Sequence, residues 1–226
     1  MAPSIRFTIE ELRRYAADAG LGLQLVVKEA FLFELAELLE GNGFVLKGGT
    51  AINKVYLPDH QRFSEDLDYD TGQSKAKVRE IVLGLGWDVK QEYFMSRSIG
   101  FLLNYEFEGV KDAVKVDFAF SINGAYGRKQ MASDFLPVSK LVNVYALMEL
   151  NMQKEHAFED RIEWKDIYDL YWMNKLYPNE FKIRDKDRFR AALNRLNVPK
   201  TANSFIPVQK RTNWAQVIET MRLLSE

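Results

Sequence analysis

The stretch between Trp87 and about Phe120 constrains the fold most, because it holds three successive strand patterns joined only by short links. The third pattern alternates clearly: Val114, Val116 and Phe118 are apolar, whereas the residues between them are charged. An apolar side chain at every second position gives a strand one buried face and one outward face. The chain therefore predicts a β-sheet in its middle portion.

Helical patterns precede and follow this sheet in the sequence. Apolar residues recur at three- and four-residue steps before it, and the same spacing returns after Pro137 and continues to the end of the chain. We therefore expect an α/β (α+β) fold, in which helices flank a mixed sheet and an α/β domain over residues 1–136 precedes a helical C-terminal domain over residues 137–226. The helices are predicted near residues 8–20, 24–39, 74–84, 139–158, 164–176, 185–196 and 212–224.

The composition excludes several classes of protein. With 226 residues, the chain has room for one large domain or two small ones. Its formal net charge is −1, so no overall field attracts nucleic acid or anionic lipid. Cysteine is absent, which excludes disulfides, thiolate zinc sites and cysteine nucleophiles. Neither a signal-peptide pattern nor an apolar run long enough for a membrane span occurs, so we expect a cytoplasmic protein with no membrane partner.

A glycine pair follows a short apolar run at residues 44–46. The chain continues as Lys47-Gly48-Gly49-Thr50, and residues 51–56 then have a helical pattern. Bare glycine backbone between a strand and a helix can approach a phosphate closely. The segment is neither a Walker P-loop nor a dinucleotide fingerprint, since both motifs need further glycines at fixed spacing. Taken alone, the glycine pair is better explained as a structural turn.

Three aspartates, Asp66, Asp68 and Asp70, alternate with Leu67 and Tyr69 in a short extended segment. In a strand these carboxylates share one face, while the apolar side chains point into the core. Carboxylate oxygens crowded in this way suit Mg²⁺ or Mn²⁺, although a solvated acidic strand end is the simpler alternative. A calcium-binding EF-hand loop is excluded, because its required glycine and closing glutamate are both missing at the corresponding positions.

A further carboxylate, Asp117, lies on the outward face of the alternating strand. Desolvation of this group is costly unless a cation or a metal is its partner. A salt bridge to Lys115 or to an arginine is the simpler alternative. Together with the glycine turn and the aspartates of residues 66–70, however, Asp117 completes the parts of a two-metal site for phosphoryl or nucleotidyl transfer.

Residues 46–56, LKGGTAINKVY, and residues 62–70, RFSEDLDYD, together resemble the AbiEii family of nucleotidyltransferase-like abortive-infection toxins. The fold of that family is similar to the DNA polymerase β superfamily, whose pattern is a glycine turn, an Asp-x-Asp pair and a third aspartate on a later strand. Two downstream blocks also match: Lys154-x-x-Ala157-x-x-x-Arg161, and residues 165–170, KDIYDL. The second block begins with lysine where the family usually has arginine. The resemblance covers residues 44–172.

The resemblance implies a set of site residues. It makes Asp66 and Asp68 the metal-binding pair, and Asp117 would be the third metal ligand. The other residues expected to be catalytic are Ser64, Lys154 and Asp166. The residues expected to bind the nucleotide lie around the glycine turn or on the downstream helix, and they are Lys47, Gly48, Gly49, Thr50, Arg62 and Arg161.

Helical spacing agrees with part of this set. Lys154 and Arg161 lie two helical turns apart, so they share a face and could both reach phosphate oxygens. Solvated surface charges would show the same spacing. Asp166 and Asp169 also share a helix face, but a helix-dipole or ion-pair role is the ordinary explanation for them.

The expected function follows from the resemblance. It implies transfer of a nucleoside monophosphate from an NTP, with Mg²⁺ or Mn²⁺ as cofactor, to a hydroxyl of RNA such as the tRNA 3′ end, or of a protein. It also implies a cognate antitoxin and a role in phage defence. A non-catalytic nucleotide-binding module and a protein-interaction module are the alternatives. Because the net charge is −1, an RNA acceptor would need a local basic surface, for which the helical portion offers Lys182, Arg184, Lys186, Arg188, Arg190 and Arg195.

Overall fold

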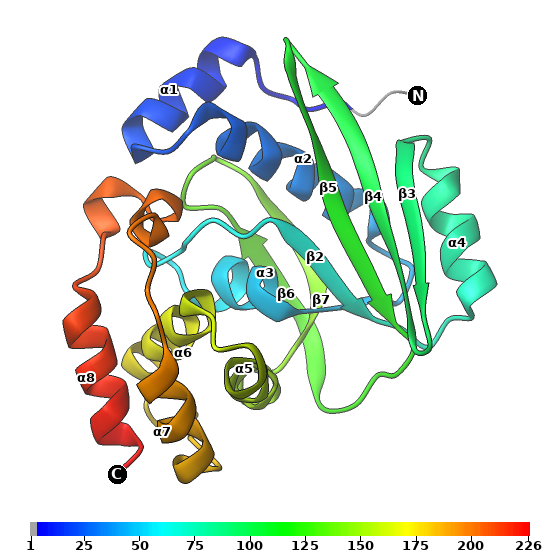
Figure 1. The fold of residues 1–226 in the computed structure, drawn as a ribbon. Helices are drawn as coiled ribbons and strands as arrows, with labels where there is room; N and C mark the ends of the chain where they lie inside the picture. The colour runs from blue at the N-terminus through cyan, green and yellow to red at the C-terminus, as the bar shows by residue number, and fades with distance from the viewer. Residues whose placement is uncertain (1–3) are drawn as a thin grey trace.

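The computed structural model describes residues 4–226 and has a seven-stranded mixed sheet at its centre (Figure 1). The strand order is β3-β4-β5-β2-β1-β7-β6. β2 is parallel to β5 and β1 is parallel to β7, whereas the other neighbours are antiparallel. The α/β fold class is thereby confirmed. The strands are β1 (Val45–Lys47), β2 (Asp66–Asp70), β3 (Asp88–Met95), β4 (Ser98–Phe107), β5 (Val110–Ala119), β6 (Tyr126–Ala132) and β7 (Ser139–Tyr145).

Two N-terminal helices, α1 (Ile9–Ala19) and α2 (Leu23–Leu39), build the main core with the sheet. The Thr8 hydroxyl caps α1, and the Glu11 carboxylate accepts the Thr8 backbone N–H in return. Gly20 ends α1 in the left-handed conformation, with φ of 63°. α2 is apolar around most of its circumference because it packs between α1 and strands β2, β5 and β7.

The outward face of β2 packs against α3 (Gly48–Ala51), which follows β1 directly. α3 continues into a π-helical turn, η1 (Ile52–Tyr56). α5 and α6 lie against this segment, and the C-terminal helices gather at one side of the sheet while α4 flanks β3 at the other (Figure 1). These helices are α4 (Lys75–Gly84), α5 (Leu147–Arg161), α6 (Trp164–Leu176), α7 (Lys186–Arg195) and α8 (Trp214–Leu224).

The helix predicted over residues 139–158 is wrong in its first part. Residues 139–145 form strand β7, and α5 begins only at Leu147. The apolar residues Val142, Val144 and Tyr145 fit either periodicity, and β1 and β6 on the two sides of β7 supply the hydrogen-bonding partners that favour the strand. The sheet therefore extends past residue 136, the predicted end of the α/β domain.

Strand β6 was not predicted. Its residues from Tyr126 to Gln130 are all exposed, so the segment lacks the apolar alternation that marks a half-buried strand. β6 is the edge of the sheet and pairs along its whole length with β7. Pairing with a neighbour, rather than an apolar pattern of its own, makes this segment a strand.

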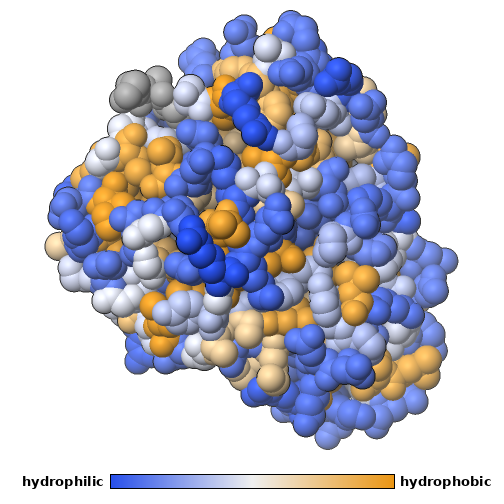
Figure 2. Space-filling model, turned by 180° about the vertical axis from the view of Figure 1, so that it is seen from behind, coloured by the Kyte–Doolittle hydropathy of each residue, from blue (hydrophilic) through white to orange (hydrophobic). Residues whose placement is uncertain are grey.

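The described residues form two principal hydrophobic cores. The larger surrounds the sheet, and the smaller lies among the C-terminal helices around Phe158, Ile167, Phe189 and Met221. Large apolar side chains that stay exposed are spread over different elements, and Figure 2 shows hydrophobic residues as separate patches among hydrophilic ones on the back of the molecule. Among residues 4–226, no helix combines the length and the apolar character needed to cross a membrane.

Candidate active site

Three carboxylates come together where β2 and β5 run side by side. The parallel pairing sets Asp66 opposite Lys115 and Asp68 opposite Asp117. The alternate residues of β2 are buried in the main core. The alternation expected from the sequence is therefore confirmed, and Asp66, Asp68 and Asp117 form one carboxylate cluster on the outward face.

The charge and burial of the carboxylate cluster suit the binding of a divalent cation. Burial, together with repulsion from Asp117 and Asp66, raises the pKa of Asp68 to about 6. Burial also raises the pKa of Asp66, although Lys115 opposes the rise. Among residues 4–226, no group donates a hydrogen bond to the carboxylate of Asp66 or Asp68, and Thr50 bonds the backbone carbonyl of Asp66 instead. Partly buried carboxylate oxygens without a donor are the hard ligands that Mg²⁺ and Mn²⁺ prefer.

Asp117 differs from the other two carboxylates because it already has partners. Lys115 Nζ lies 2.6 Å from Asp117 Oδ2, and the Tyr93 hydroxyl donates to Asp117 Oδ1. The salt bridge to Lys115 that was the simpler alternative is therefore present. In the part of the chain that the structure describes, no three His, Cys, Asp or Glu side chains are arranged as a ready metal cage.

The glycine pair lies directly against this cluster. Gly48 has φ of 72°, and a Cβ there would collide with Asp68 Oδ2, so only glycine brings the backbone so close to the carboxylate. Gly48 and Gly49 line a cavity of about 530 Å³, here called the glycine cavity. Asp68 and Lys47 also line it, and Lys47 Nζ lies 2.5 Å from Asp70 Oδ1.

Helix α5 supplies the opposite wall of the glycine cavity, with Lys154 and Arg161 among its lining residues, and Asp166 and Asp169 of α6 bind these side chains from behind. Arg161 binds both carboxylate oxygens of Asp166, at 2.6 and 2.7 Å. Lys154 Nζ lies 3.1 Å from Asp166 Oδ1 and 2.9 Å from Asp169 Oδ2. Burial alone would raise the pKa of Asp166, but Arg161 and Lys154 outweigh it and hold that pKa below its ordinary value.

Three of the predicted residues are buried behind the cavity wall. Arg62 forms a two-point ion pair with Asp169, with distances of 2.9 and 2.6 Å. Thr50 Oγ1 lies 2.9 Å from Ser64 Oγ. The lining of the glycine cavity does not include Thr50, Ser64 or Arg62, although all three pack next to the glycines or β2.

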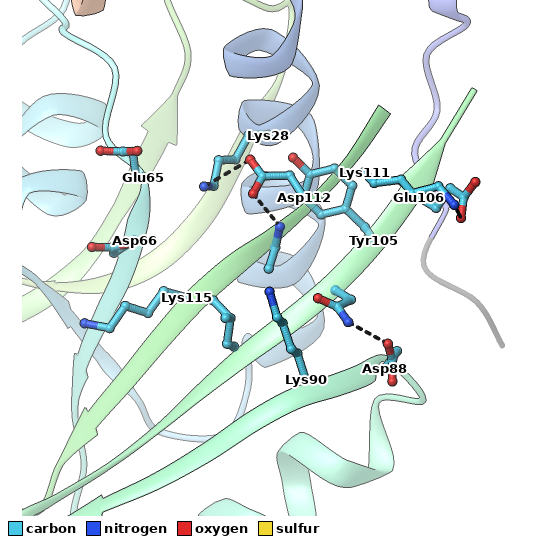
Figure 3. Close-up of a pocket in the computed structure, with 13 residues that line it drawn as sticks. Lys28, Glu65, Asp66, Asp88, Lys90, Tyr105, Glu106, Lys111, Asp112 and Lys115 are labelled. Atoms are coloured by element: carbon cyan, nitrogen blue, oxygen red, sulfur yellow. Dashed lines mark hydrogen bonds and ion pairs between the residues drawn. The ribbon is translucent and has the colours of Figure 1, made fainter. Parts of the chain in front are cut away.

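A second, outer cavity of about 890 Å³ continues along the same sheet face from Asp66 and Lys115 (Figure 3). Figure 3 shows Lys115 extended along the sheet toward Asp66. Four lysines and five carboxylates line this cavity, so the two signs of charge are nearly balanced. The outer cavity is therefore polar without being an anion-binding groove.

Sequence reasoning missed several residues that organise the site. The Asn53 side-chain amide donates to the Gly49 backbone carbonyl and to Asp169 Oδ1. Its side-chain oxygen, Oδ1, accepts the backbone N–H of Arg62. The sequence offered one signal for Asn53, because a residue four positions after Gly49 lies one helical turn from it and can contact it. Tyr93 had no such signal, because its contact with Asp117 depends on pairing between strands.

The fold is that of a nucleotidyltransferase. A putative nucleotidyltransferase from H. pylori has a TM-score of 0.66 at 17% sequence identity, covering 91% of this chain and 94% of that chain. JHP933 from Helicobacter pylori has a TM-score of 0.63 at 15% identity, covering 91% of both chains. MenT4, the nucleotidyltransferase toxin Rv2826c from Mycobacterium tuberculosis H37Rv, has a TM-score of 0.63 at 18% identity, covering 97% of this chain and 88% of that chain.

The sequence also matches one family model. Residues 30–225 match the model described as nucleotidyl transferase AbiEii toxin, Type IV TA system. The chain therefore belongs to the AbiEii nucleotidyl transferase toxin family, and the expected family is confirmed. Comparison with curated proteins finds no similar sequence.

Proposed function

We propose that this protein transfers a nucleoside monophosphate from an NTP to a hydroxyl of RNA, such as the tRNA 3′ end, or of a protein. In this proposal it is the toxin of a toxin–antitoxin pair that acts in the cytoplasm during abortive phage infection. One observation carries the proposal: Asp68 and Asp117 are in register on adjacent strands, beside Asp66 and a cavity lined by Gly48 and Gly49. A triphosphate bound in this cavity would have carboxylates and bare backbone within its reach.

Asp66, Asp68 and Asp117 would hold Mg²⁺ or Mn²⁺. A divalent cation, when bound, neutralises phosphate oxygens and lowers the pKa of an attacking hydroxyl. Asp66 lines the outer cavity and Asp68 lines the glycine cavity, so β2 joins the two cavities. The geometry supports entry of the nucleotide through the glycine cavity and of the acceptor from the side of Asp66.

The nucleotide would be oriented by the walls of the glycine cavity. The Gly48 and Gly49 backbone leaves room for phosphate oxygens, and Lys47 contributes positive charge from the same segment. Arg161 reaches the cavity from α5, and its side chain is 52% exposed, so its Nη1 group could contact the triphosphate while Nε and Nη2 hold Asp166. Lys154 is almost fully buried and lines the same cavity.

Other predicted site residues would act through their neighbours. Asp166 holds Lys154 and Arg161 in place and is a positioning residue in this proposal. Arg62 supports the back of Gly49. The Thr50 and Ser64 hydroxyls tie α3 to β2. Loss of any of these contacts would displace the groups that line the cavity.

The acceptor is the least constrained part of the proposal. Arg188 of the basic helical segment pairs with Glu159 and Asp160, and Arg190 pairs with Asp187, so part of that positive charge is already neutralised. An RNA acceptor would therefore be bound mainly through shape and a few contacts near the site. A protein hydroxyl is the second acceptor class that this charge balance permits.

Transfer is tested by incubating the protein with each labelled NTP, Mg²⁺, total RNA and cell extract. We expect label to move to RNA or protein, and Asp68→Asn to reduce transfer at least about a hundredfold with the fold unchanged. Asp18→Asn is the matched control, because Asp18 is exposed on α1 and lines neither cavity.

The alternatives give different results in the same experiment. A non-catalytic module would bind an NTP without releasing pyrophosphate, and a protein-interaction module would bind no NTP. If no NTP labels any acceptor and Asp68→Asn behaves like the parent, the enzymatic proposal is wrong. Growth arrest on expression, relieved by Asp68→Asn but not by Asp18→Asn, would support the toxin role.

A further inference from the structure

We propose that Lys115 and Tyr93 form a latch that holds Asp117 in the metal-free protein and releases it when a divalent cation binds the carboxylate cluster. Both are positioning residues. The inference rests on the proposed function, because it assigns Asp117 to a metal site. It adds a competition inside that site, between a lysine of the chain and the cation.

Both oxygens of the Asp117 carboxylate are engaged by the latch. Oδ2 lies 2.6 Å from Lys115 Nζ, and Oδ1 accepts the Tyr93 hydroxyl. Lys115 Nζ also lies 5.8 Å from the centre of the Tyr93 ring, so the latch residues contact each other. Each of these bonds uses one lone pair of its oxygen, and the Lys115 ammonium repels a cation that approaches the remaining lone pairs, so a metal ion competes with the latch for Asp117.

The strand register explains why Lys115 reaches this position. Lys115 and Asp117 are alternate residues of β5, so they share the outward face, and Lys115 is paired with Asp66 on β2. Its ammonium therefore lies among the carboxylates that would hold the cation. A monovalent ammonium compensates only part of the charge of three carboxylates, so a divalent cation competes for the same oxygens.

Tyr93 reaches Asp117 only because the strand between them carries a glycine. Tyr93 of β3 is paired with Gly100 of β4, and Gly100 is paired with Asp117 of β5. A Cβ at Gly100 would collide with both Asp117 Oδ1 and the Tyr93 hydroxyl. The missing side chain is what allows a tyrosine two strands away to donate to this carboxylate.

Release of the latch is physically easy. The Lys115 side chain is 41% exposed and borders the outer cavity, so its ammonium can return to water by rotation of its own stem. Lys154, which also pairs with aspartates, is 4% exposed and has no such route. Lys115 is thus an exchangeable cation of the carboxylate cluster.

The latch is tested by Mn²⁺ binding without nucleotide, measured by electron paramagnetic resonance of free Mn²⁺ and by calorimetry. We expect Lys115→Met to tighten Mn²⁺ binding about three- to tenfold, because the bound state no longer competes with an ion pair. Tyr93→Phe, which changes no charge, is expected to tighten it about twofold to threefold. Both gains should disappear in an Asp117→Asn background, because the latch acts through that carboxylate.

Lys111→Met is the matched control. Lys111 lies on the same strand and in the same outer cavity, but it pairs with Glu106, so its removal is expected to leave Mn²⁺ affinity unchanged. Circular dichroism checks that each variant is folded.

The outcomes separate this inference from the proposed function. If the parent binds Mn²⁺ and Asp68→Asn loses it, but Tyr93→Phe has no effect or the Lys115→Met gain persists without Asp117, Lys115 acts only as a general charge and the latch is wrong. An equal gain from Lys111→Met leads to the same conclusion. If neither the parent nor Lys115→Met binds Mn²⁺, the metal-dependent function itself is contradicted.

Discussion

At the scale of single residues, the charged groups of this protein are mostly partners of one another. A chain of ion pairs runs from Arg62 to Asp169, Lys154, Asp166 and Arg161, and most of it is buried. Buried ion pairs add little net stability over apolar packing, but breaking one leaves an uncompensated charge. The network therefore determines where the groups lie more than how stable the protein is.

Asp169→Asn tests this network. Asp169 is fully buried and pairs with both Arg62 and Lys154, so the change leaves two buried cations short of a counter-ion. We expect a loss of about 3–5 kcal/mol in the free energy of unfolding, measured by urea denaturation. Asp160→Asn is the control, because that side chain is 54% exposed and its pairs are expected to contribute less than about 1 kcal/mol. Equal losses in the two variants would contradict the explanation.

Asp68→Asn is expected to stabilise the metal-free protein at neutral pH. The pKa of Asp68 is raised to about 6 in the folded state from its ordinary 3.8, mainly by burial. Between these values the folded state binds more protons than the unfolded state, so stability falls as pH rises through this window. In EDTA at pH 7.5 we expect the variant to be more stable by about 1–2 kcal/mol, with a smaller difference at pH 5. Urea denaturation measures both, and a destabilised variant at pH 7.5 would contradict the prediction.

At the scale of elements, two glycines determine how closely the backbone and the carboxylates approach. Gly48 lets the start of α3 contact Asp68, and Gly100 lets β4 pass beneath the contact between Tyr93 and Asp117. In both places a strand or helix is locally weakened by a residue that adds no packing. In return, the backbone can lie close to the Asp68 carboxylate, and Tyr93 can reach Asp117.

Gly48→Ala is expected to lower both stability and nucleotide transfer. Its φ of 72° is strained for alanine, and the new Cβ would collide with the Asp68 carboxylate. We expect a loss of about 1–3 kcal/mol in urea denaturation and a clear loss of transfer. Gly127→Ala on β6 is the control, because nothing lies within 4 Å of a Cβ there. Transfer by Gly48→Ala at the parental rate would show that the close approach is not needed.

At the scale of the whole molecule, the sheet and the C-terminal helices have separate cores that meet at the site. Met173 of α6 packs into the sheet core, and the Phe63 N–H donates to the Phe205 carbonyl at 2.7 Å. The pair of Arg62 with Asp169 crosses the same junction. The glycine cavity is lined from both sides, so its shape depends on this junction.

We therefore expect the two parts to unfold together. Three of the four tryptophans, Trp164, Trp172 and Trp214, lie in the helical part, so tryptophan fluorescence of Trp87→Phe reports on that part alone. In urea its transition should coincide with the far-UV circular dichroism transition of the whole chain. In this background, Asp169→Asn should lower the urea concentration at the midpoint of the fluorescence transition. Two separate transitions in the Trp87→Phe protein would show that the parts are independent.

The sequence by itself determined the local structure and the chemical types at the site. Alternation identified the strands of residues 87–120, helical spacing identified the first helix near residues 8–20, and the spacing of Asp66 and Asp68 placed both on one face. Each of these depends on neighbours within a few residues, which is why periodicity detects them.

The tertiary structure alone decided which distant residues meet. Only strand pairing places Asp117 opposite Asp68, carries Tyr93 across Gly100, and makes residues 139–145 a strand rather than a helix. The positive charges of Arg62 and Lys154 were visible in the sequence, but their partner Asp169 was not assigned to them, because ion pairs form across helices whose packing no local pattern encodes. Short-range periodicity fixes the faces of an element, whereas contact between faces depends on burial and pairing of the whole chain.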